Sequence, residues 1–192
     1  MRKVLFIFGE LNDLDVDWLL SAGKKQLITP GTALISEGKP VDALFIVIEG
    51  LFNVTVAGMG SEKIAQLVAG EIAGEMSFIE ARPPSATVRA ETNGIVLAIP
   101  RVRLAQKLKE DTGFAARFYR ALAIFLSFRL RLRNMQYAQL VQGKSGRPAT
   151  PAQAAASEEY TEEADELDAN ILDTVYLAGA RFDRMLRKLV DR

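Results

Sequence analysis

The pattern of apolar and polar positions gives the chain a β-rich middle and helical ends. Between Lys25 and Pro100, short apolar runs alternate with turns that contain glycine or proline. Short strands at this regular spacing are typical of a jelly-roll barrel, also called a double-stranded β-helix. The clearest expected strands cover residues 43–49, 51–56, 63–68, 87–90 and 95–99, and Asn93-Gly94 is expected to form a hairpin turn between the last two. The predicted fold is therefore mainly β with flanking helices.

Helical signals lie on both sides of this region. Residues 14–22 are expected to form a helix capped by Asn12 or Asp13. The apolar run at residues 4–8, just before it, predicts a strand or an extended lead-in. Beyond the strands, apolar residues recur at helical spacing, which predicts helices over residues 102–109, 114–139 and 169–190.

The segment between the last two helices differs in composition from the rest of the chain. It is rich first in Gly, Pro, Ala and Ser and then in carboxylates, which predicts a flexible, acidic linker at residues 143–168. We therefore expect three parts, a domain at residues 1–142, this linker, and an amphipathic C-terminal helix at residues 169–192.

Composition narrows the classes of function. Lys and Arg number 24, as do Asp and Glu, so no net charge attracts the chain to nucleic acid or anionic lipid. The chain has neither His nor Cys, which removes the commonest general base, the usual serine triad, thiolate chemistry and most zinc sites. The longest apolar stretch, residues 121–128, is too short to cross a bilayer. We expect a cytoplasmic, non-enzymatic protein without catalytic residues, cofactor or metal site.

The candidate chemistry lies between Gly70 and Ala90. Gly74 allows a sharp turn, and residues 75–79 can form one helical turn whose first N–H groups lack partners within the helix. Such an end attracts anions, phosphate in particular. Ser85 then begins a strand in which alternate residues share one face.

This stretch resembles the phosphate-binding cassette of the cyclic-nucleotide-binding family, which includes the catabolite activator protein and the regulatory subunits of the cAMP-dependent kinase. The matching residues are Gly74, Glu75, Pro83, Ser85, Ala86, Thr87 and Val88. The resemblance covers about residues 10–135 and implies a ligand site for cAMP or another cyclic nucleotide. The candidate ligand-binding residues are Gly74, Glu75, Met76, Ser77, Arg82, Ser85, Ala86 and Thr87.

One position departs from the family pattern. Pro84 stands where the resemblance implies the arginine that binds the cyclic phosphate. A charge-assisted hydrogen bond contributes about 1.5–3 kcal/mol, so its loss is expected to lower affinity by about one to two decades. Arg82 can replace that arginine from another direction or remain a surface residue, and Arg89 is a second candidate. Glu75 either accepts a bond from the ribose 2′-hydroxyl or caps the amides of its own short helix.

Two functions fit these features. In the first, the barrel senses cAMP or a related nucleotide and signals through its C-terminal helices. In the second, a degenerate barrel without a ligand serves as a protein-protein interaction or oligomerisation module. The resemblance implies a homodimer formed through helix 114–139, and the stripe on helix 169–190 predicts a protein partner. No basic recognition helix follows the long helix, so we expect no DNA binding.

Overall fold

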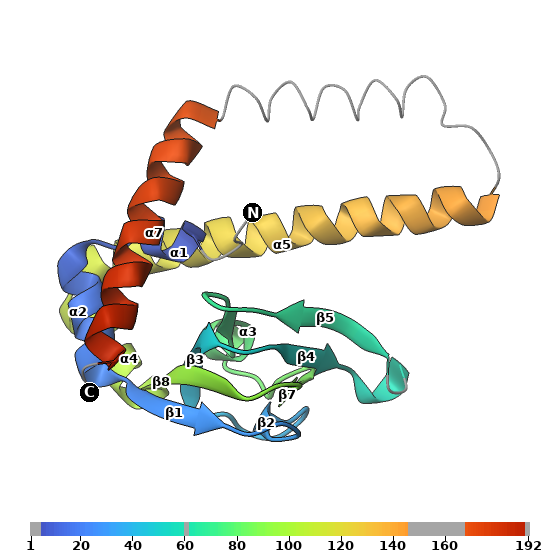
Figure 1. Cartoon of the computed structure of the whole chain (residues 1–192), viewed down its shortest axis with the longest axis horizontal. Helices are drawn as coiled ribbons and strands as arrows, with labels where there is room; N and C mark the ends of the chain where they lie inside the picture. The colour runs from blue at the N-terminus through green and yellow to red at the C-terminus, as the bar shows by residue number, and fades with distance from the viewer. Residues whose placement is uncertain (1–4, 60–61, 146–167, 191–192) are drawn as a thin grey trace.

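A computed structural model describes residues 5–59, 62–145 and 168–190 (Figure 1). Its first element corrects the sequence prediction, because the apolar run forms helix α1, Leu5–Glu10, rather than a strand. Periodicity cannot separate a short buried strand from a short buried helix, and here the run packs against two other helices, α5 and α7. The next helix is confirmed as α2, Asp13–Ala22, with Asn12 as its N-cap.

Two four-stranded antiparallel sheets form the barrel, which confirms the jelly-roll prediction. Their strand orders are β1-β8-β3-β6 and β2-β7-β4-β5. The strands are β1 Lys24–Ile28, β2 Ala33–Ile35, β3 Ala43–Glu49, β4 Phe52–Thr55, β5 Lys63–Leu67, β6 Ile72–Ala73, β7 Thr87–Ala90 and β8 Gly94–Pro100. A short 3-10 turn, η1 Ala57–Met59, lies between β4 and β5, which pair as a hairpin.

The turn at Asn93-Gly94 is not the hairpin that the sequence predicted. β7 pairs with β2 and β4, whereas β8 pairs with β1 and β3, so this turn carries the chain from one sheet to the other. Gly94 is needed for close approach, because a Cβ there would lie 2.8 Å from the Glu49 carbonyl oxygen. The Asn93-Gly94 dipeptide therefore predicted a turn correctly, but β7 and β8 on either side of it do not pair with each other.

The central strand β3 contributes to two apolar cores. Leu44, Ile46 and Ile48 join the core beneath the helices, whereas Phe45 and Val47 join the core inside the barrel. Successive side chains of a strand point to opposite faces, so a continuous apolar run fills both cores.

The described residues contain four further helices. They are α3 Glu75–Glu80, α4 Arg101–Glu110, α5 Thr112–Ser145 and α7 Asp168–Val190. Figure 1 shows α5 running past the barrel, with α7 near α1 and α2. Because α5 continues to Ser145, residues 143–145 are helical rather than linker. The rest of the predicted linker, apart from residue 168, lies outside the described residues. Within the described ranges, no helix is long and apolar enough to span a bilayer.

Candidate functional site

The cassette forms the turn and short helix that its sequence predicts. Gly74 is the N-cap of α3 and has φ 90°, a left-handed conformation that favours glycine. A Cβ at this position would lie 3.2 Å from the Ala43 carbonyl oxygen of β3. Gly74 therefore sets α3 close against the sheet and places the next residue, Glu75, at the start of the helix.

Glu75 is buried and forms an ion pair with the long helix. Its side chain is 4% exposed, and its Oε1 accepts a bond from Arg129 Nη1 of α5 at 2.6 Å. Burial raises the pKa of the Glu75 carboxyl, and the Arg129 guanidinium and the N–H groups of Glu75 and Met76 oppose that rise. The Glu75 carboxylate therefore joins α3 to α5.

A second arginine fixes the body of α3. Arg101, the first residue of α4, donates from Nη2 to the Ser77 carbonyl oxygen at 2.8 Å and from Nη1 to the Val41 carbonyl oxygen at 3.1 Å. Its guanidinium also lies 5.4 Å from the centre of the Phe78 ring. The Ser77 hydroxyl accepts from Arg101 and donates to the Arg82 carbonyl oxygen. The bonds of buried Ser77 therefore connect α3, α4 and the following loop.

The loop after α3 places the remaining predicted residues differently. Arg82 and Ser85 are exposed, and Ala86 is half-buried. Thr87 is half-buried, and its Oγ1 accepts a bond from the Glu37 backbone N–H at 3.1 Å. Pro84 is buried between these exposed residues. Its carbonyl oxygen accepts from the Gly38 N–H at 2.9 Å, so this residue holds the loop against the turn after β2.

Neither of the two arginines predicted as alternative phosphate-binding cations is held at the cassette, since Arg82 is exposed and Arg89 has a partner elsewhere. Arg89 donates from Nη1 to the Gly31 carbonyl oxygen, which directs its head toward the turn before β2. Met76, another predicted contact, is 46% exposed on α3. The structure thus buries Glu75 and Ser77, half-buries Gly74, and leaves Met76, Arg82 and Ser85 at the surface.

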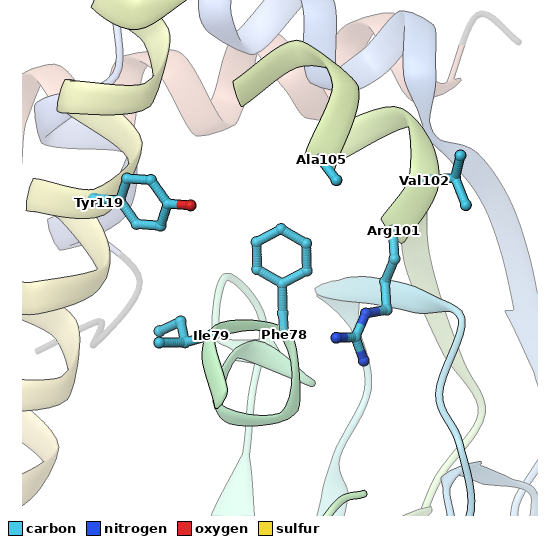
Figure 2. A pocket seen from close by; sticks show the side chains of 6 residues that line it. All are labelled: Phe78, Ile79, Arg101, Val102, Ala105 and Tyr119. Carbon is cyan, nitrogen blue, oxygen red and sulfur yellow. The ribbon is translucent and has the colours of Figure 1, made fainter. Parts of the chain in front are cut away.

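A separate hollow lies beside the cassette. Figure 2 shows its lining from α3, α4 and α5, and its volume is about 370 Å³. The lining residues are Phe78, Ile79, Arg101, Val102, Ala105 and Tyr119. None of the predicted ligand contacts lines it, and the polar groups of Arg101 are already bonded to Val41 and Ser77.

Sequence reasoning missed the roles of Arg101 and Arg129. Arg129 belongs to a set of arginines around the apolar face of α5, and only its fold position distinguishes it from the others. A weak signal is its spacing of four residues from Phe125, over whose ring its guanidinium lies at 5.5 Å. For Arg101 the weak signal is its position, because it directly follows Pro100 at the start of a predicted helix.

These features define a class of protein, a jelly-roll barrel in which a short helix with a buried carboxylate contacts the long helix that follows the barrel. Residues 25–111 match the family model described as cyclic nucleotide-binding domain. Over these residues the chain therefore resembles the cyclic nucleotide-binding family.

Known proteins agree with this assignment. The cAMP-dependent protein kinase regulatory subunit of Yarrowia lipolytica is 36% identical over 90 residues, a match that covers 47% of this chain and 24% of that protein. A cyclic nucleotide-binding domain from Methylobacillus flagellatus KT has 23% identity and a TM-score of 0.63, covering 78% of this chain and 85% of that one. The N-terminal domain of a transcriptional regulator from Streptomyces coelicolor A3(2) has 29% identity and a TM-score of 0.54, covering 72% and 95%. The chain spans less than a third of the length of the curated relatives it matches.

Proposed function

We propose that this chain is a non-enzymatic regulatory protein that senses cAMP or a related nucleotide at its cassette and signals through α5. The observation that carries the proposal is the contact between Glu75 and Arg129, which links the cassette directly to the long helix. The resemblance to this family implies that the buried Glu75 carboxylate accepts a hydrogen bond from a ribose hydroxyl of the ligand. A ligand that does so competes with Arg129 for the same oxygen atoms.

Competition at a buried carboxylate has a mechanical consequence. The side chain of Arg129 is 29% exposed, so it has room to leave Glu75 along the solvent side. Once a ligand hydroxyl replaces it, α5 loses a contact that holds it to α3. Binding energy is then converted into a change in the position of the long helix, as a ligand that prefers one of two states requires.

The phosphate end of the site is weaker than the sugar end. Pro84 supplies neither a guanidinium nor an N–H, and Arg89 is bonded elsewhere. The donors near the expected phosphate position are the Ser85 hydroxyl and the backbone amides of Ser85 and Ala86. We expect micromolar or weaker binding, because the missing bidentate contact is worth about one to two decades in affinity.

Calorimetry on four forms of the chain tests the proposal. We expect weak heats for cAMP or cGMP with the wild-type chain, at least tenfold tighter binding for Pro84→Arg, and no binding for Glu75→Gln. Pro84→Ala is the matched control, because it also removes the ring but adds no cation. Absence of heat at millimolar ligand for both the wild-type chain and Pro84→Arg would refute nucleotide sensing.

A second function is favoured by the same two residues. Pro84 is buried and Glu75 already has an ionic partner within the chain, which also fits a barrel that has lost its ligand and acts as an interaction module. In that case the barrel is a scaffold, and homodimerisation through residues 114–139 becomes the main activity of the chain. A dimer by light scattering, with no ligand response in any variant above, supports the module. A monomer without ligand binding contradicts both proposals.

A further inference from the structure

The C-terminal helix α7 is docked on the N-terminal helices of its own chain (Figure 1). Its buried stripe consists of Ala178, Phe182, Met185 and Leu189. The Phe182 ring lies 5.6 Å, centre to centre, from that of Phe8 in α1. The apolar face of α7, for which the sequence predicts a protein partner, is therefore covered in its described part by α1 and α2.

Helix α2 presents carboxylates in two opposite directions. Asp13 and Asp17 are four residues apart and share one face, whereas Asp15 lies two residues from each and points the other way. On the α7 side, Asp13 pairs with Arg184 at 2.7 Å, and Asp17 pairs with both Arg184 at 2.7 Å and Lys188 at 2.6 Å.

On the opposite side, α2 is attached to α5. Asp15 accepts from Arg117 Nε at 2.6 Å and from its Nη2 at 2.8 Å. The Trp18 ring of α2 lies 5.2 Å from the Phe114 ring of α5. The side chain of Asp15 is 4% exposed, against 35% for Asp17 and 58% for Asp13. The ion pair with α5 is thus the buried one, and the ion pairs with α7 are the solvated ones.

Helix α1 repeats this arrangement. Glu10 pairs with Arg120 of α5 at 2.9 Å. The carbonyl oxygens of Phe8 and Gly9, in the last turn of α1, accept from Arg181 Nη1 of α7 at 2.9 and 3.0 Å. Since the last carbonyls of a helix have no partner within it, Arg181 satisfies two groups that α1 leaves open. Both N-terminal helices therefore bridge α5 and α7.

We infer that α1 and α2 couple α5 to α7, so that loosening α5 undocks α7 and exposes its apolar, basic face. The order of release follows from exposure, because solvated ion pairs are weaker than buried ones. Undocking is reversible, because α7 belongs to the same chain and redocks intramolecularly. This coupling does not depend on whether the cassette binds a nucleotide.

A thiol reporter measures the docked state, since the chain contains no cysteine. Ala178 is fully buried at the α7 interface, and Ala180 lies on the exposed side of the same helix. Ala178→Cys is expected to react slowly with a thiol reagent, at a rate set by undocking. Ala180→Cys gives the unprotected rate and is the matched control.

Three substitutions separate direct release from coupling. Asp17→Asn removes the negative charge that Arg184 and Lys188 face and is expected to raise the Ala178→Cys labelling rate about three- to tenfold. Arg117→Gln acts only on the α5 side and is expected to raise it at least threefold. Lys63→Gln, which breaks an exposed pair with Glu91 on the barrel, is expected to leave the rate unchanged.

Hydrogen exchange distinguishes coupling from general unfolding. In the Arg117→Gln chain without a thiol, we expect faster exchange at residues 178–189 while strand β3 keeps its protection. If Arg117→Gln leaves both labelling and exchange of α7 at wild-type values while Asp17→Asn raises them, the coupling is wrong. If β3 loses protection to the same extent as α7, the effect is global unfolding and the coupling is again refuted.

Discussion

The ion pair between Glu75 and Arg129 is expected to stabilise the fold, and Arg129→Gln tests that expectation. Removing one partner of a fully buried ion pair costs about 3–5 kcal/mol. Because the Arg129 side chain is 29% exposed, solvent screens part of the interaction, and we expect a loss of about 2–3 kcal/mol in the free energy of unfolding near pH 8. Most of that loss arises from leaving the Glu75 carboxylate buried without a cation.

The same substitution changes how stability depends on pH. Burial raises the pKa of Glu75 above its ordinary 4.5, and Arg129 holds it down. Without Arg129 the folded-state pKa rises further, so the folded chain binds the proton more tightly than the unfolded chain. Stability is then fully present below the unfolded pKa and is lost as pH rises through the folded pKa. The destabilisation by Arg129→Gln is therefore smaller at pH 5 than at pH 8.

Urea unfolding of four chains at both pH values gives the measurement. They are the wild-type chain, Arg129→Gln, Glu75→Gln and the double variant, which form a double-mutant cycle. We expect a coupling energy of about 2 kcal/mol at pH 8 and less at pH 5. Glu75→Gln is the matched control, because it retains the side-chain shape and cannot ionise. Additive effects at pH 8, or an equal loss at both pH values, would refute the reasoning.

Two further predictions concern backbone geometry at the ends of helices. Ala81, which follows α3, has φ 52° and ψ 34°, and Ala81→Gly is expected to stabilise the fold by about 0.5–1 kcal/mol in urea unfolding by relieving that left-handed strain. Asn12 and Asp15 form a reciprocal capping box at the start of α2, and Asn12→Ala is expected to lower the free energy of unfolding by about 1 kcal/mol.

Each of these two changes has a control of the same kind. Ala123→Gly lies on the exposed side of α5, within a regular helix, and is expected to destabilise by about 1 kcal/mol. If Ala81→Gly destabilises to the same extent, strain at Ala81 is not the cause. Asn12→Asp keeps an oxygen acceptor at the cap and is expected to remain close to wild type. An equal loss for Asn12→Asp and Asn12→Ala contradicts the capping argument.

Local patterns predicted most of the barrel. Strands β3 and β7 have the predicted bounds, and those of β4 differ from the prediction by one residue at each end. The short β6, Ile72–Ala73, was missed because a two-residue strand has no periodicity to detect. The pairing of β7 and β8 in different sheets was also missed, since a turn signal is local while strand partners are set by the whole fold.

The site was predictable on the cassette side and not on its far side. Gly74 and Glu75 are consecutive in sequence, so their turn and helix are local events. Arg129 is 54 residues from Glu75, and its role depends on how α5 crosses the barrel. Spacing along one helix cannot identify which of several arginines meets a carboxylate on another element.

Helix α7 also shows that sequence spacing does not identify the partner of a helix face, and here the missing partner bears on function. An amphipathic stripe indicates that one face is buried, but it does not name the surface that buries it. The partner of the α7 stripe begins at Phe8, whose carbonyl oxygen accepts a bond from Arg181 across 173 residues. Because α1 and α2 of the same chain cover the described part of that face, this part becomes available to another molecule only after α7 leaves them. Any external partner of α7 must therefore compete with an intramolecular contact. Its apparent affinity equals its intrinsic affinity multiplied by the fraction of chains in which α7 is undocked.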